Sequence, residues 1–435
     1  MSSSSRVSIV NSKFVRNQAS YAPTGYLTGY LDTGVGGVLM GYQGQYLITV
    51  DNSTFLSNEA GAFGQYGGGL MSVYGTWGQV SDLTIRGCLV ENQTAGSYPV
   101  LYFSAYGRVS LVDSIFRRSL PSQPELYYEQ RGSYPYSEMC MVRNDGGGFL
   151  SSLNVTRCAF ANSSSAFHSQ NQHHIEIADS SFTSLQKGED SAHTYGGAFY
   201  LYNVDSLLVR GSVFRHNSAY SHGGAWYLVY VTDVLIVDSE FEANVQGDRD
   251  SDSGNGGGAM YLDYPETYVA RRCTFANNIA YAGLGGAVKL TFMDSALVKF
   301  EECSLIHNEE YVYYDMSYSA AAVFVDSQYN WEANIELEVA NSTFLGNTGQ
   351  GGTLGVYGGN VSARVVDSTF QDNVGYSDSS EFGAGIFFYT QYGSFLSKST
   401  LYRNQSGSYG AAIIFPHSQF AGYVDLRSST FVHNR

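Results

Sequence analysis

The chain has 435 residues, of which 14% are charged and 15% aromatic, and acidic residues outnumber basic ones by 39 to 23, so the formal net charge is -16. The aromatic content excludes intrinsic disorder, and the acidic balance argues against a nucleic-acid or anionic-membrane surface. The 49 glycines follow no three-residue period, which excludes collagen, and they make the chain a poor helix former. No apolar stretch is long enough to predict a transmembrane helix.

One short string recurs along the chain: a small residue, any residue, Phe or another apolar residue, two further residues and Asn. The first copy runs from Ser12 to Asn17 and the second from Ser53 to Asn58. There are 14 copies at a mean spacing of about 32 residues, and four are degraded. The copies predict two structural ladders, formed by Phe214, Phe241, Phe275, Phe344, Phe370 and by Asn217, Asn244, Asn278, Asn308, Asn347, Asn373.

A second string, Gly-Gly-small-apolar, alternates with the first. Clear copies begin at Gly196, Gly223, Gly257 and Gly285. Between the two strings, apolar residues alternate with a period of two and then shift phase at an Asp, Asn, Gly or Arg, which indicates a corner between two short strands. Two adjacent glycines in each repeat exclude helical repeats, and the spacing fits neither leucine-rich repeats nor propeller blades.

These patterns predict an all-β fold, a parallel β-helix (solenoid) of about 14 coils of roughly 30 residues, with three short strands per coil and about 4.8 Å between coils. We expect one β-helix domain over residues 1–435, with a long insertion loop at about 117–145. The chain opens inside one copy and stops just after the Asn of another, so we expect a segment of a longer array. Each Phe should point inward, and each Asn should sit at a turn and bond to the Asn of the neighbouring coils.

Four of the five cysteines occupy the small-residue position two before the Phe of their copy: Cys88, Cys158, Cys273 and Cys303. None of the five has the CxxC spacing of a zinc site. We therefore expect buried thiols in a ladder shared with serines. Cys273 and Cys303 fall in adjacent coils, so a disulfide between them is the alternative.

The alternation of Gly-Gly-Ala-apolar with Phe-x-x-Asn, as at Gly223 to Trp226 and Phe241 to Asn244, resembles the repeats of the bacterial polymorphic outer-membrane protein family. The resemblance covers nearly the whole chain. It implies a right-handed parallel β-helix of the pectin-lyase-like type, exposed at the cell surface as an autotransporter passenger, and adhesion to host cells. We expect the secretion signal and the anchor to lie outside this chain.

The longest insertion carries the candidate ligand-binding residues Tyr127, Tyr128, Tyr134 and Tyr136. Exposed tyrosine clusters suit protein or glycan contacts, because they offer a large contact area at a low entropy cost. The alternative is a loop that packs on the flank of the coil.

A weak calcium site is the one cofactor that the sequence suggests. Asp248, Asp250 and Asp252 place three carboxylates at every second residue, which is the ligand spacing of a Ca²⁺ loop. Ala259 stands where such a loop has its Glu, so a solvated acidic loop is the alternative. Five further residues fall in consecutive coils and could share an edge as metal ligands: His168, His173, His174, His193 and His222.

We expect a surface-exposed, adhesin-like or interaction rod, extracellular or at the cell surface. It would bind a host or neighbouring-cell protein or glycan through loops on its flank, without a nucleic-acid partner, and could continue the array end to end. One alternative is a structural spacer of a surface fibre. The other is a polysaccharide lyase or hydrolase, which needs clustered carboxylates or an Asp with a basic residue. No such motif stands out, so we expect no enzyme and no catalytic residue; Glu301, Glu302, Glu336 and Glu338 should point outward.

Overall fold

The computed structural model describes residues 4–19, 38–60, 70–75, 80–95, 101–104, 107–121, 140–186, 195–247, 256–281, 283–311, 319–327, 332–358, 360–376, 385–390, 393–406, 412–414 and 424–435. The regular structure of these residues consists of strands. Within the described ranges, no helix is long and apolar enough to cross a membrane. The chain forms two compact units, unit 1 (Met1–Ser206) and unit 2 (Leu207–Arg435).

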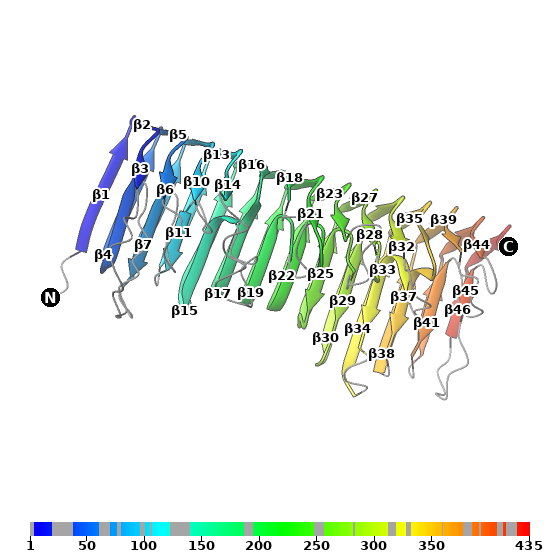
Figure 1. The fold of residues 1–435 in the computed structure, drawn as a ribbon. Helices are drawn as coiled ribbons and strands as arrows, with labels where there is room; N and C mark the ends of the chain where they lie inside the picture. Colours follow the sequence, from blue (N-terminus) through cyan, green and yellow to red (C-terminus); the bar gives the residue numbers. More distant parts are fainter. Residues whose placement is uncertain are drawn as a thin grey trace, which may run out of the picture. The chain divides into compact units, whose positions relative to one another are not determined.

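Unit 1 stacks three kinds of strand in parallel, and Figure 1 shows them side by side. The strands with the Phe positions are β2 (Lys13–Val15), β5 (Thr54–Leu56), β9 (Leu89–Glu91), β13 (Ile115–Arg117), β16 (Ala159–Ser163) and β18 (Ser181–Leu185). The strands after the Asn positions are β3 (Gln18–Ala19), β6 (Glu59–Ala60), β10 (Thr94–Ala95) and β14 (Leu120–Pro121). The third kind comprises β1 (Ser4–Val10), β4 (Leu39–Asp51), β7 (Met71–Gly75), β8 (Asp82–Arg86), β11 (Leu101–Ser104), β12 (Arg108–Val112), β15 (Cys140–Thr156), β17 (Ser165–Ala178) and β19 (Phe199–Arg210), which ends in unit 2.

Unit 2 repeats this arrangement (Figure 1). Its Phe strands are β20 (Val213–Arg215), β23 (Glu240–Glu242), β27 (Thr274–Ala276), β31 (Ser304–Ile306), β35 (Thr343–Leu345), β39 (Thr369–Gln371), β43 (Thr400–Tyr402) and β47 (Thr430–Val432). The strands after Asn are β21 (Ser218–Ala219), β24 (Val245–Gln246), β28 (Ile279–Tyr281), β32 (Glu309–Tyr311), β36 (Thr348–Gly349), β40 (Val374–Gly375) and β44 (Gln405–Ser406). The third kind comprises β22 (Trp226–Val237), β25 (Met260–Asp263), β26 (Thr267–Arg271), β29 (Val288–Thr291), β30 (Ala296–Glu301), β33 (Ala320–Asp326), β34 (Asn334–Ala340), β37 (Gly352–Tyr357), β38 (Asn360–Val366), β41 (Ile386–Tyr389), β42 (Ser394–Ser397), β45 (Ile413–Ile414) and β46 (Val424–Arg427).

The Phe positions of neighbouring coils pair in register, as the repeat predicts. In unit 2, Phe241 pairs with both Phe214 and Phe275, and each of the three is fully buried. The Phe241 and Phe275 rings stack with their centroids 5.1 Å apart. Burial of one such ring contributes on the order of 2 to 3 kcal/mol, and the contribution recurs in each coil. The prediction of a parallel β-helix is confirmed.

Two left-handed corners flank each Phe strand. The first lies three residues before the Phe position, as at Asp238 (φ 51°) and Arg272 (φ 50°), and the second lies two residues after it, as at Ala243 (φ 51°) and Asn277 (φ 55°). The first corner is the phase shift seen in the sequence. Charged corners of adjacent coils pair: Arg272 Nε lies 2.6 Å from Asp238 Oδ1. Exposed ion pairs add little stability, so the corners are fixed mainly by the backbone pairing around them.

The small residues before each Phe form the predicted ladder of serines and cysteines. The backbone N–H of Cys303 donates to the Ser342 hydroxyl at 3.1 Å, and the N–H of Ser342 donates to the hydroxyl of Ser368 at 3.2 Å. Cys88, Cys158, Cys273 and Cys303 are buried free thiols. The thiol interpretation is therefore confirmed, and the structure contains no disulfide between Cys273 and Cys303. Burial raises the pKa of the Cys158 thiol to about 11.

The predicted Asn ladder is continuous in the described coils of unit 2. The backbone N–H and Nδ2 of Asn308 donate to Oδ1 of Asn347 at 2.9 and 3.0 Å, and Nδ2 also donates to the Phe275 carbonyl at 2.9 Å. The same pattern of three bonds recurs at Asn244, Asn278, Asn347, Asn373 and Asn404. These side chains are fully buried, so the ladder satisfies polar groups that would otherwise lie in the core.

In two degraded copies of unit 1 the ladder uses a different residue from the Asn that the sequence suggests. Asn92 and Asn162 occupy the second left-handed corner, at φ 54° and 51°. Gln93 takes the ladder position, where its Oε1 accepts from Nδ2 of Asn58 at 3.0 Å. Ser163 takes the ladder position in the other copy, where its hydroxyl accepts the backbone N–H of Ser119 at 2.9 Å. In these copies the Asn falls one residue closer to the Phe position because it occupies the corner. The ladder position itself keeps its distance from the Phe position and is filled by Gln or Ser.

In three Gly-Gly strings of unit 2, the second glycine allows neighbouring coils to approach closely, at Gly224, Gly258 and Gly286. A Cβ on Gly258 would lie 2.0 Å from the carbonyl oxygen of Gly286, its counterpart in the next coil. A side chain there would push the coils apart, which explains why the string keeps a glycine at this corner.

Candidate functional site

The predicted binding and calcium residues lie outside the described residues. This holds for Tyr127, Tyr128, Tyr134 and Tyr136 of the long insertion, and for Asp248, Asp250 and Asp252 of the acidic loop. They remain predictions.

The predicted histidine edge is only partly described, since His193 lies outside the described ranges. In unit 1, His173 lies 2.8 Å from Asp205 and His174 lies 2.8 Å from the Ser206 hydroxyl, while His168 is buried against the Tyr200 ring. In the part of the chain that is described, no three metal-ligating side chains lie close enough to hold an ion. The described histidines therefore serve local hydrogen bonds and packing.

Stacked tyrosines lie on β22, on β25 and at the corner that follows β25 in unit 2. We call Tyr227, Tyr230, Tyr261 and Tyr264 the tyrosine patch. Tyr227 pairs in register with Tyr261, and their rings stack at 5.4 Å. The rings of Tyr230 and Tyr264 lie 5.2 Å apart, and Tyr230 is 48% exposed. Each of the two aromatic pairs joins adjacent coils, and the second pair exposes the Tyr230 ring while Tyr264 is half-buried.

Tyr230 and Tyr264 adopt left-handed backbone conformations, at φ 54° and 61°. For a bulky side chain this costs roughly 1 to 2 kcal/mol relative to the usual conformations. Both lie four residues after the first apolar residue of their Gly-Gly string. The same place in unit 1 holds Asn171 and Asn203, both at φ 54° and joined by a hydrogen bond of 2.7 Å. The repeat therefore accepts an Asn at this corner, and unit 2 uses strained tyrosines instead.

A polar cluster lies next to the tyrosine patch. Tyr227 donates a hydrogen bond of 3.0 Å to Asp263, and His222 packs against the Tyr227 and Tyr261 rings at 4.8 and 4.9 Å. Lys289 Nζ lies over the Tyr261 ring at 4.8 Å. Burial, with a smaller contribution from Lys289, lowers the pKa of His222 to about 3, so the imidazole is neutral at physiological pH.

The carboxylates that sequence inspection placed on the outer surface lie there. Glu336 is exposed, and Glu338 is half-buried and pairs with Lys299 at 3.0 Å. Glu301 is half-buried and accepts from Arg271 Nε at 2.7 Å. Each paired carboxylate is held by a cation of a neighbouring strand.

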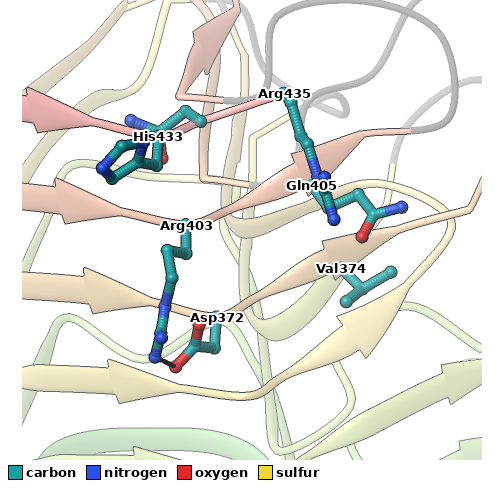
Figure 2. A pocket seen from close by; sticks show the side chains of 7 residues that line it. Asp372, Val374, Arg403, Gln405, His433 and Arg435 are labelled. Atoms are coloured by element: carbon teal, nitrogen blue, oxygen red, sulfur yellow. Dashed lines mark hydrogen bonds and ion pairs between the residues drawn. The ribbon is translucent and has the colours of Figure 1, made fainter.

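A groove of about 720 Å³ runs along the second left-handed corners of three coils in unit 2, at Asp372, Arg403 and His433. Figure 2 shows Arg403 pointing at Asp372, and Arg403 Nη2 lies 2.6 Å from Asp372 Oδ2. The Arg403 guanidinium lowers the pKa of Asp372. Asp372, Arg403 and His433 occupy the same corner of successive coils, so the groove follows the regular repeat.

Comparison with known proteins found no matching family model, no matching curated protein and no matching solved structure.

Proposed function

We propose that this chain is a β-helical interaction module that binds a protein or glycan ligand through tyrosines on its flank. The observation that supports it is the strained, stacked pair Tyr230 and Tyr264, of which Tyr230 is exposed and Tyr264 half-buried. Backbone strain persists only when the surrounding structure enforces it, and it tends to occur at functional sites. The repeat already contains a less strained solution at this corner, the Asn pair of unit 1.

Stacked tyrosines suit such a ligand for physical reasons. A tyrosine ring offers an apolar face and a hydroxyl, and it loses little rotamer entropy on binding. Tyr227 and Asp263 add a hydrogen-bonding pair next to the exposed rings. A sugar ring or a flat peptide side chain could cover the exposed rings while its polar edge reaches this pair.

The cellular setting of the proposal comes from the resemblance to the polymorphic outer-membrane protein repeats. By that resemblance the module is extracellular or at the cell surface, and its partner is a host or neighbouring-cell protein or glycan. The predicted insertion site at Tyr127, Tyr128, Tyr134 and Tyr136 belongs to the same proposal.

The double variant Tyr230→Asn with Tyr264→Asn tests the proposal. Because Asn171 and Asn203 show that this corner accepts Asn, we expect the variant to fold with equal or higher thermal stability. On a glycan array and in a cell-binding assay, affinity should fall at least about tenfold, or about 1.4 kcal/mol.

The control is Tyr281→Ala with Tyr311→Ala, which removes a stacked pair at 5.3 Å from a different face of the same unit. It should leave binding unchanged. A chain lacking residues 122–139 separates the two predicted sites. If the Asn variant binds as well as the parent chain, the tyrosine patch is not the ligand site, and loss of binding on the deletion alone would assign it to the insertion.

The spacer function is a second candidate, favoured by the unbroken Asn and Ser/Cys ladders of unit 2. It predicts that the parent chain binds no ligand in either assay.

A further inference from the structure

Lys289 is a buried lysine on the outward side of a strand. The chain has few lysines, and this one is only 6% exposed. It lies in β29, between β25 and β33, where it pairs in register with Tyr261 on one side and Phe324 on the other. Burial of an ammonium group is costly unless an opposite charge accompanies it.

Two aspartates flank this lysine on the same face. Asp263 and Asp326 both pair in register with Thr291, two residues along from Lys289. At the spacing and rise of a sheet, each aspartate is about 8 Å from Lys289 between backbones, a span that extended lysine and aspartate side chains cover together. Asp326 is 1% exposed, and its attraction for the Lys289 ammonium is stronger than that of Asp263.

Burial favours the uncharged forms of Lys289 and Asp263. Burial lowers the pKa of Lys289, against the opposing attraction of Asp326 and Asp263. Burial also raises the pKa of Asp263, despite hydrogen bonds from Tyr261 and Tyr227. The nearby His222 is neutral, so it adds no competing charge.

We propose that Lys289 and Asp326 form an intramolecular amide bond that covalently joins two adjacent coils. The ammonium of Lys289 gives up a proton, and the nitrogen lone pair attacks Cγ of Asp326. One carboxyl oxygen then leaves as water, carrying the two protons lost by the nitrogen, and the C–N bond replaces the C–O bond.

The step needs no oxidant and no further reactant, since an amine and a carboxylic acid condense to an amide and water. Two features of the site drive it. Folding places the two groups on one face of adjacent strands, two residues apart in register, which replaces a bimolecular encounter by an intramolecular one. The buried site also disfavours the charged pair relative to neutral groups and to a neutral amide.

Intact-mass measurement of the folded full-length chain tests the bond. We expect a mass lower than that of the sequence by one water, and a proteolytic peptide in which Lys289 is joined to the segment that contains Asp326. Lys289→Arg should have the full mass calculated from its own sequence, with no loss of water. Asp326→Asn should still form the bond with loss of ammonia, so its mass is that of the parent crosslink.

The matched control is Lys299→Arg, which changes a half-exposed lysine ion-paired with Glu338 and should retain the loss of one water. The proposal is overturned if the folded parent protein has the full mass of its sequence and Lys289 is recovered in a linear peptide. Lys289 and Asp326 would then interact only through their charges. Loss of water in the Lys289→Arg variant would equally overturn it, because the bond would then lie elsewhere.

Discussion

The substitution Asn308→Leu is expected to destabilise the protein by about 3 to 5 kcal/mol, among the largest effects of a single change. Leu has the same number and branching of side-chain heavy atoms as Asn, so the largest part of the cost comes from hydrogen bonding. The change removes both bonds donated by the Asn308 side chain, to Phe275 and to Asn347. It also removes the oxygen that accepts the backbone N–H and side-chain amide of Asn278, at 3.1 and 2.9 Å. Each buried group left without a partner costs about 1 to 3 kcal/mol.

Chemical denaturation followed by circular dichroism measures this effect. The matched control is Asn360→Ala, which removes a half-buried Asn side chain outside the ladder whose one hydrogen bond, to the Glu332 carbonyl, is solvent-exposed; it should change stability by less than about 0.5 kcal/mol. Equal midpoints for Asn308→Leu and the parent chain would show that the ladder does not stabilise the coils.

Stability is expected to fall as pH rises from about 4.5 to about 8, because of Glu310. This residue lies in an inward column of small residues, paired with Ala280, and its Oε2 would lie 2.6 Å from a Cβ placed on Gly349. Burial raises the pKa of Glu310 from 4.5 to about 8, although Ser319 and the backbone of Gln350 and Gly351 favour the charged form.

The sign follows from the raised pKa. The folded state binds the proton more tightly than the unfolded state, so the stabilisation by protonated Glu310 is complete below about pH 4.5 and is lost as pH rises through about 8. At about 1.4 kcal/mol per pKa unit, the loss is on the order of 3 to 5 kcal/mol.

Glu310→Gln should remove this contribution, so the difference in denaturation midpoint between variant and parent should grow from pH 4.5 to pH 8. Glu309→Gln is the control, because Glu309 is the half-buried neighbour that accepts a hydrogen bond from Tyr311. A constant difference between Glu310→Gln and the parent across this pH range would contradict the assignment.

Sequence reasoning predicted the coil because its positions repeat. Phe241 and Phe275 occupy the same place in consecutive copies, and they pair in register. The corners were predictable too, since residues such as Asp238 interrupt the alternation at a fixed distance from Phe. Copies that lack Asn were misread, because an amide at Gln93 or a hydroxyl at Ser163 does the same hydrogen bonding.

Neither the tyrosine patch nor the group formed by Lys289, Asp263 and Asp326 was predicted from the sequence. Tyr227 and Tyr261 are 34 residues apart in sequence, and Tyr261 and Lys289 are 28 apart. They come together only when the Gly-Gly strings are aligned, because each stands second after Gly-Gly-Ala. Aligning the Gly-Gly strings with one another would have shown that these side chains lie side by side. The left-handed backbone of Tyr230 carries no signal in the sequence, since bulky residues rarely adopt it.

Spin-label distances test most directly the claim that each repeat is one stacked coil. Labels are placed on cysteines at Glu240 and Thr369, and in a second protein at Glu240 and Thr400, with the native cysteines replaced by Ser. These sites are four and five strands apart in the stack of Phe strands. We expect backbone separations of about 19 and 24 Å, an increase of one strand spacing. Equal separations, or a shorter one for the second pair, would contradict the stacked coil.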